Sequence, residues 1–384
     1  MFADRTNWDL QPNRLSKALA ALPAGRPVFD LTASNPTAVG FHYDERAFRR
    51  AIRSSAFRRY KPEPRGLLPA RRAVAAYYAA RKMKVSPGDL ILTTGTSEAY
   101  SFVFRTLCNP GDEILVPAPS YPLFSYLADI QDVRLARYPL VYDHGWQIDF
   151  HALEQAVTPR TRGVIVVNPN NPTGHFCKPA EIKNLNEICS ARRLALIADE
   201  VFLDFALQSK NPPSLAGNSE ALTFTMSGLS KISGLPQVKA AWLLISGPEQ
   251  WKAPAGARVE MISDTFLSMN AIVQGALPEF LKWRRGFQRQ LVARVRKNLA
   301  ELDRQLSTQP SCTRLEIEGG WYAILRVPAT RSDEDLAIEL LARKGVYVHP
   351  GHFYDFQTDG YLVVSLIAPE HIFAKGIKLL LSAF

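Results

Sequence analysis

The sequence predicts an α/β protein with a mostly parallel sheet that helices cover on both faces. Short apolar runs rich in β-branched residues alternate with helical patterns through the first two thirds of the chain. These runs are apolar throughout instead of alternating with polar residues, as expected of strands buried on both faces. The last third has a different rhythm, which predicts a second, smaller α+β unit. At 384 residues the chain is long enough for two or three domains.

The apolar runs and the segments between them define the expected elements of the main sheet. Strands are expected at 90–94, 113–118, 163–168, 194–199, 222–227 and 240–246. Helical patterns occur between them at 97–108 and 179–193. Strands that alternate with helices of this length are typical of parallel βα units.

The pattern changes after the last of these strands. Residues 246–257 are rich in Gly and Pro and are interpreted as a looser stretch, and a long helical region is expected over about 265–308. Strands are expected within 314–327, 345–351 and 360–368, with a helix over 332–345. This arrangement predicts the smaller α+β unit.

Composition excludes several classes of protein. Hydrophobic residues make up 47% and charged residues 21% of the chain, as in globular proteins. The N-terminus lacks the apolar core of a signal peptide, and no apolar run is long enough to span a membrane. The cysteines are widely spaced, which favours reduced thiols in the cytoplasm over a disulfide frame or a metal site: Cys108, Cys177, Cys189 and Cys312.

The net charge of +10 does not by itself indicate nucleic-acid binding. The basic residues are scattered, and the densest run, 282–297, is interpreted as the solvated face of a long helix. We therefore expect neither a nucleic-acid partner nor a membrane partner.

Polar residues follow several of the expected strands, at the sheet edge where α/β proteins bind ligands. Gly95-Thr96-Ser97 stands between a strand and a helix. Backbone N–H groups and two hydroxyls at a helix N-terminus can cradle a phosphate, although Thr and Ser are also ordinary helix caps.

Two further strand ends carry an asparagine and an aspartate. The stretch VVNPNNPTGHF (166–176) contains two Asn-Pro steps and either forms a rigid loop or points an Asn amide at a phenolic oxygen. Asp199 ends an apolar strand, where a carboxylate needs a partner. The partner would be either a pyridinium nitrogen or a cationic side chain in an internal salt bridge.

A lysine occupies the end of the next strand. Lys231 follows the small-residue run Ser227-Gly228-Leu229-Ser230 and precedes Ser-Gly-Leu-Pro. A lysine amine forms a Schiff base with an aldehyde where its surroundings let it lose a proton. The alternative is a solvated lysine just past a strand.

The order and spacing of these motifs resemble those of the fold-type I, pyridoxal-phosphate-dependent aminotransferases of classes I and II, over essentially the full chain. The resemblance implies a large cofactor-binding domain with a seven-stranded type of sheet over 46–275. It implies an interdomain helix and small domain over 276–384, which residues 1–45 join. It also implies pyridoxal 5′-phosphate as cofactor, an amino donor and a keto acid as substrates, and a cytoplasmic homodimer.

The resemblance also implies roles for individual residues. Lys231 would form the Schiff base and carry the proton, Asp199 would pair with the pyridine nitrogen, and Asn171 would bind the phenolic oxygen. Tyr121 would stack on the ring. The remaining cofactor-binding positions are Gly95, Thr96, Ser97 and Ser230, with Tyr60 reaching the phosphate from the neighbouring subunit. Ser34, Asn35, Asn171 and Val363 occupy the positions that meet the substrate.

Three positions depart from the family pattern. Phe202 stands where the family usually has Tyr, and Lys239 where it has an Arg that grips the phosphate. Val363, two residues before a Ser, replaces the Arg that usually binds the substrate α-carboxylate. The candidates to replace the Arg are Arg326, which lies in a different expected strand, and the pair His349 and His352, which is nearby in sequence.

These observations predict an aminotransferase that works by a ping-pong mechanism. A β-lyase, C–S lyase or decarboxylase on the same scaffold is the alternative, since one Schiff base supports several bond cleavages. A non-catalytic sensor of this fold would carry an added winged-helix domain, and only 28 residues precede FDLTASNPT here.

Overall fold

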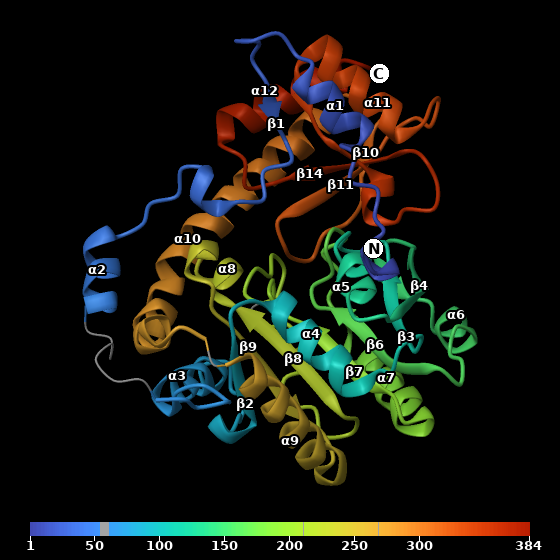
Figure 1. Ribbon diagram of the computed structural model, residues 1–384. Coiled ribbons are helices and arrows are strands. Elements are labelled where there is room, and N and C mark those ends of the chain that lie inside the picture. The colour runs from blue at the N-terminus through green and yellow to red at the C-terminus, as the bar shows by residue number, and fades with distance from the viewer. Residues whose placement is uncertain (54–60, 210, 268) are drawn as a thin grey trace.

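The computed structural model describes residues 1–53, 61–209, 211–267 and 269–384. A large sheet occupies the lower part of the view in Figure 1, and a smaller sheet with its helices lies above it. The long helix α10 (Ala271–Leu306) runs along one side from the lower part to the upper part (Figure 1). Tyr60 lies outside the described residues.

The large sheet has eight strands and is mostly parallel. Its order is β2 (Leu90–Thr93), β9 (Ala241–Ser246), β8 (Thr223–Gly228), β7 (Ala195–Asp199), β6 (Thr161–Val167), β3 (Glu113–Ala118), β4 (Arg134–Tyr142) and β5 (Trp146–Ile148). The run from β8 to β4 is parallel, whereas β9 pairs antiparallel with β8 and β2, and β5 pairs antiparallel with β4. The predicted fold class is confirmed.

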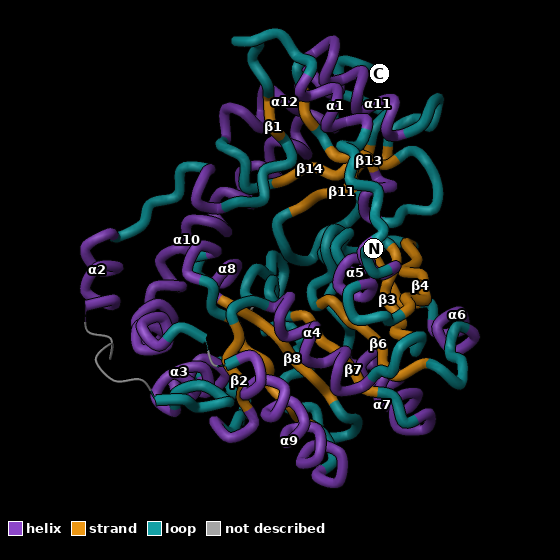
Figure 2. Tube along the Cα trace, in the orientation of Figure 1, coloured by secondary structure: helices purple, strands orange, loops and turns teal. Residues whose placement is uncertain are grey.

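Alternate residues of the central strands enter two different cores. On β7, Ile197 packs with α4 (Thr96–Leu107) and α9 (Glu249–Phe266), and Leu196 packs on the opposite face with α6 (Phe150–Gln155) and α7 (Pro179–Arg192). Figure 2 shows these helices around the strands. Burial on both faces is why the predicted strands are apolar at every position.

The smaller sheet is antiparallel, in the order β10 (Thr313–Arg314), β11 (Tyr322–Arg326), β14 (Tyr361–Ser365) and β13 (His349–Pro350). Helices α11 (Asp333–Glu339) and α12 (Glu370–Leu381) accompany it. Strand β1 (Phe29–Asp30), near the N-terminus, pairs in parallel with β12 (Val346–Tyr347), so the two ends of the chain meet here.

One sequence expectation about helices is wrong. Residues 246–257 do not form a looser stretch, because α9 begins at Glu249 and includes Pro254. A proline near the start of a helix removes only one backbone hydrogen bond, and the buried Ala255 and Val259 stabilise this helix by packing under the sheet. The long helical region expected over about 265–308 is confirmed as α10, which begins at Ala271 after the end of α9 at Phe266.

Several elements were not predicted because they are short or lack a regular pattern. They are α1 (Arg14–Ala20), α2 (Glu45–Arg53), α3 (Leu68–Ala79), α5 (Phe124–Asp129), α6, α8 (Leu229–Ile232), α12 and the strands β1, β4 and β5. The expected helix over 332–345 ends as a π-helical turn at Leu340–Lys344, and Gly345 follows with positive φ. Within the described residues, no helix has the length and apolar character needed to cross a membrane.

Candidate active site

A cavity of about 230 Å³ lies between the carboxyl ends of the central strands and the smaller sheet. From the large-sheet side it is lined by Thr96, Tyr121, Asn171, Asp199, Phe202, Ser230 and Lys231. From the other side it is lined by Ser34, Tyr322, His349 and Tyr354. The structure therefore brings together residues that are far apart in the chain, from Ser34 to Tyr354. They include most of the residues predicted from the sequence.

Lys231 enters the cavity from α8, directly after β8. Its Nζ lies 4.9 Å from the ring centre of Trp321 and 5.6 Å from that of Phe202. Burial lowers the pKa of the Lys231 amine, and the charge of Asp199 opposes this shift. The surroundings thus favour the neutral, nucleophilic amine that Schiff-base formation requires.

Asp199, the last residue of β7, lies at the base of the cavity and is 8% exposed. One carboxylate oxygen accepts a hydrogen bond from the backbone N–H of Val201 at 3.1 Å, and the other accepts one from the hydroxyl of Tyr100 at 3.1 Å. Burial raises the pKa of this carboxyl to about 6. A cationic ring nitrogen is the partner that would keep the carboxylate ionised.

Asn170 and Asn171 have different roles in the loop after β6. The Asn170 side chain accepts a hydrogen bond from the Thr173 hydroxyl at 2.9 Å and so holds the turn. Asn171 is 7% exposed and lines the cavity, and its Oδ1 has no hydrogen-bond partner among the described residues. The structure thus keeps the Asn171 amide available for a bound group.

The turn between β2 and α4 lies at the cavity, where it could bind a phosphate group. Gly95 is the N-cap of this 12-residue helix, and Thr96 and Ser230 line the cavity. Helix N-termini attract anions because their N–H groups are unpaired and the helix dipole is positive there. Ser97 is exposed and is not part of the lining. Tyr121 lines the cavity and is 39% exposed.

Other predicted positions lie away from the cavity wall. Lys239 is exposed and has positive φ. Asn35 is exposed and accepts a hydrogen bond from the Thr37 N–H at 3.0 Å. Val363 is 1% exposed within the apolar core, and Arg326 is exposed on β11 beside the rings of Tyr142 and Tyr361.

Sequence reasoning missed four aromatic residues of the site. Tyr100 holds Asp199, Trp321 packs near the Lys231 amine, and Tyr322 and Tyr354 line the cavity. Trp321 and Tyr322 could have been suspected, because GGWYAI places two large aromatic residues directly after two glycines. Nothing in the local sequence marks Tyr100 or Tyr354.

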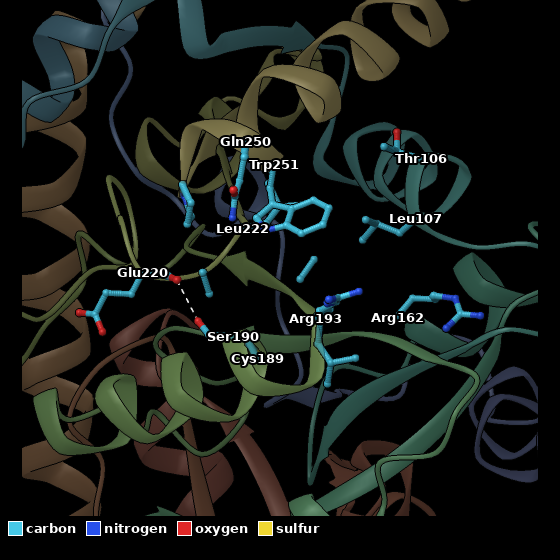
Figure 3. Close-up of a pocket in the computed structure, with 14 residues that line it drawn as sticks. Thr106, Leu107, Arg162, Cys189, Ser190, Arg193, Glu220, Leu222, Gln250 and Trp251 are labelled. Carbon is cyan, nitrogen blue, oxygen red and sulfur yellow. Dashed lines mark hydrogen bonds between the residues drawn. The ribbon is translucent and has the colours of Figure 1, made fainter.

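A second cavity, of about 390 Å³, lies at the opposite edge of the large sheet (Figure 3). Arg193, Trp251 and Glu220 are among its lining residues, and the Ser190 hydroxyl donates to the Glu220 carbonyl at 2.9 Å. It includes no residue predicted for the site, and it lies at the amino ends of β7 and β8 instead of their carboxyl ends.

Comparison with known proteins identifies the family. Residues 16–369 match the family model described as aminotransferase class I and II, which is most of the chain. The chain belongs to the class I and II aminotransferases.

Relatives of this aminotransferase cover nearly its whole length. It is 25% identical to the glutamate-pyruvate aminotransferase AlaA of Escherichia coli (strain K12), over 94% of this chain and 91% of that protein. It is 26% identical to the tyrosine aminotransferase of Bos taurus, over 95% of this chain and 81% of that protein. A solved aminotransferase from Escherichia coli has a TM-score of 0.86 and 23% identity, over 100% of this chain and 97% of that one.

This class I and II aminotransferase is a transferase that depends on pyridoxal phosphate. The residues that line the cavity have the chemistry needed to bind that cofactor. A buried carboxylate at Asp199, a buried amine at Lys231 and the side-chain amide of Asn171 face one cavity. The N-terminus of α4 opens on its rim.

Proposed function

We propose that this enzyme exchanges an amino group between a donor and a keto acid by a ping-pong mechanism, with Lys231 as the Schiff-base lysine and proton carrier. The convergence of Lys231 and Asp199 in one buried cavity supports this proposal most strongly. When bound, pyridoxal phosphate supplies an electron sink for the carbon that bears the substrate amine.

Each residue then has a defined task. Asp199 holds a proton at the ring nitrogen by its negative charge, and Tyr100 keeps that carboxylate in place. The Asn171 amide donates to the phenolic oxygen, while Thr96, Ser230 and the α4 N-terminus hold the phosphate. When its amine is free, Lys231 would serve as the general base that takes the proton from the substrate Cα and as the acid that gives it back.

The first test is chemical mapping of the lysine. We predict that borohydride reduction followed by peptide mapping finds the pyridoxyl group on Lys231, because this amine lies in the cavity and Lys239 is exposed away from it. A label on Lys239 would contradict the assignment. Lys231→Ala is expected to bind cofactor but to show no turnover.

A second measurement separates transfer from elimination. A transferase converts the cofactor to its amine form with the donor alone and releases no ammonia. A β-lyase acting on a suitable amino acid releases ammonia and pyruvate. Absorbance and ammonia assays on the same holoenzyme sample therefore distinguish the two reactions.

We further propose a cytoplasmic homodimer with the domain limits 1–45, 46–275 and 276–384 and with Tyr60 contributed across the interface. The resemblance to the family supports the dimer, and the free cysteines suit a reducing compartment. Light scattering should give twice the 42.8 kDa chain mass. A monomer that retains full activity would contradict the shared site.

A further inference from the structure

The substrate side of the cavity has no arginine at the position where the family usually places one. Val363 occupies that position in β14, is 1% exposed and packs in the apolar core. Among the described residues that line the cavity, Lys231 is the only lysine or arginine, and the cofactor would occupy its amine. Recognition of the substrate therefore depends on other groups.

An imidazole stands next to Val363. Strand β13 pairs with β14 so that His349 is directly opposite Val363, and directly opposed residues of antiparallel strands point to the same face of a sheet. His349 lines the cavity, whereas its neighbour His352 is exposed and is not part of the lining. His349 thus lies beside Val363 and reaches the cavity.

The groups of the cavity wall around His349 are uncharged. Its Nδ1 lies 3.1 Å from the Tyr354 hydroxyl, and its ring packs against Phe353 with 5.7 Å between ring centres. Tyr322 and Ser34 interact through their hydroxyls and line the same wall. Tyr354, Tyr322 and Ser34 can each donate or accept a hydrogen bond without carrying charge.

We propose that Ser34, Tyr322, His349 and Tyr354 form a neutral recognition site for the group attached to the reacting carbon. The preferred donor is then an amine whose reacting carbon bears an uncharged hydroxymethyl or amide group in place of a carboxylate. This inference rests on the proposed amino transfer. In the half-reaction such a donor exchanges its amino group for the cofactor's aldehyde oxygen, and an amino alcohol leaves as a hydroxy ketone without any other oxidant.

The ionisation of His349 supports this specificity. Burial lowers the pKa of its imidazole to about 4, and the charge of Asp30 opposes the shift. The other titratable groups facing it are the hydroxyls of Tyr347 and Tyr354, and burial raises the pKa of both. The imidazole is thus neutral near pH 7, and a carboxylate entering beside it loses hydration without gaining a cation.

The same geometry allows carboxylate substrates in a pH-dependent way. Keto acids and amino acids bind to the fraction of enzyme in which His349 is protonated, and this fraction falls about tenfold for each pH unit above its pKa. Amino alcohols bind to the neutral form. The ratio of the two rates therefore rises about tenfold for each unit of acidification, because other ionisations affect both donors alike.

The test compares matched donors on the holoenzyme. The two pairs are L-alanine with L-alaninol and L-phenylalanine with L-phenylalaninol. Within each pair the donors differ only in carrying a carboxylate or a hydroxymethyl group on the reacting carbon. Single-turnover conversion of the cofactor, followed by absorbance between pH 6 and 8, gives kcat/KM for each donor. We expect the amino alcohol to be preferred at pH 8, and the amino acid to gain about tenfold relative to it per unit of acidification.

Variants assign the effect to His349. His349→Gln should abolish the pH dependence of the ratio, whereas the matched change at the exposed neighbour, His352→Gln, should leave it intact. His349→Arg should reverse the preference toward the amino acid. As a readout independent of turnover, the NMR titration of the His349 imidazole should shift to higher pKa with propanoate and should not shift with 1-propanol.

The outcomes also separate this inference from the proposed function. No reaction of either amino alcohol, or a ratio that does not change with pH, would overturn the inference. Rapid transamination of amino acids alone would leave amino transfer established while removing the neutral site. If the pyridoxyl label were absent from Lys231, the amino-transfer proposal itself would fail.

Discussion

Phe202 lines the cavity with a phenyl ring where the family usually has a phenol. The ring packs edge-on against Trp321, with 5.1 Å between ring centres, and lies near the Lys231 amine. Because a phenylalanine donates no hydrogen bond, the phenolic oxygen of the cofactor would be left with Asn171 as its proposed donor. A less stabilised phenolate is more basic and holds the shared proton of the lysine linkage more tightly.

We therefore predict that Phe202→Tyr lowers the pKa of the linkage between Lys231 and the cofactor. A pH titration of the visible spectrum measures this pKa in the wild type and the variant. Phe205, a buried neighbour that is not part of the cavity lining, provides the control: Phe205→Leu should leave the pKa unchanged. An upward shift, or none, in Phe202→Tyr would show that position 202 does not face the phenolic oxygen.

Asp199 gives a second prediction at the residue scale. Its pKa of about 6 in the folded chain lies above the ordinary value of 3.8, so the ionised carboxylate destabilises the folded apoprotein. Below pH 3.8 the group is protonated in both states and has no effect. The penalty develops as the pH rises to about 6, and two units at about 1.4 kcal/mol each amount to roughly 3 kcal/mol.

We expect Asp199→Asn to stabilise the apoprotein above pH 6 by up to roughly 3 kcal/mol and to have little effect near pH 4. Urea unfolding at several pH values measures the free energy of unfolding. The same change should weaken cofactor binding, because the pyridine nitrogen loses its carboxylate. A stabilisation that is equal at all pH values would contradict the assigned cause.

At the scale of elements, the loop between β6 and α7 determines where Asn171 lies. Gly174 has φ of +71°, and a Cβ there would lie 2.5 Å from the carbonyl oxygen of Gly319. That loop also bonds to the segment before β11, since the Phe176 N–H donates to Glu318 at 2.9 Å. The close approach of the two backbones therefore requires glycine at 174.

Gly174→Ala should destabilise the protein by about 2–4 kcal/mol, from the strained backbone and the displaced loop together. It should also weaken cofactor binding, because Asn171 moves with the loop. Gly286→Ala in α10 is the control, since nothing lies within 4 Å of a Cβ there and alanine favours a helix by about 0.5–1 kcal/mol. Thermal unfolding that is equal for the two variants would contradict the role of the close approach.

At the scale of the whole molecule, the cavity exists only where the two sheets face each other. The loop holding Ser120 contacts the smaller sheet's side, and the Ser120 N–H donates to the Tyr354 carbonyl at 2.9 Å. In the function proposed above, one wall of the cavity would hold the cofactor and the other would meet the substrate.

We predict that the wild type uses aspartate and glutamate poorly, with kcat/KM below about 10⁴ M⁻¹s⁻¹. Val363→Arg should raise kcat/KM for simple amino acids, because a guanidinium pairs with the α-carboxylate. Val363→Met matches the added length without the charge and should give no such gain. Wild-type rates at or above that level would show that another group already binds the carboxylate.

The sequence by itself determined the class of fold and the cofactor side of the site. The strands around Asp199 and Lys231 could be predicted because burial on both faces imposes a long apolar run, and each residue follows its run directly. The carboxyl ends of neighbouring parallel strands lie at one edge, so these side chains had to be near one another. The absence of arginine at 363 was also visible in the sequence.

Only the tertiary structure decided which of the candidate cations lies beside Val363. His352 is nearer to Val363 in sequence than His349 is, and Arg326 is farther away, but strand pairing puts His349 opposite Val363 and leaves the other two exposed. Tyr100, Tyr322 and Tyr354 reach the site through contacts between segments far apart in the chain. Such contacts leave no local periodicity in the sequence, since they depend on how the two sheets pack and not on the residues beside them.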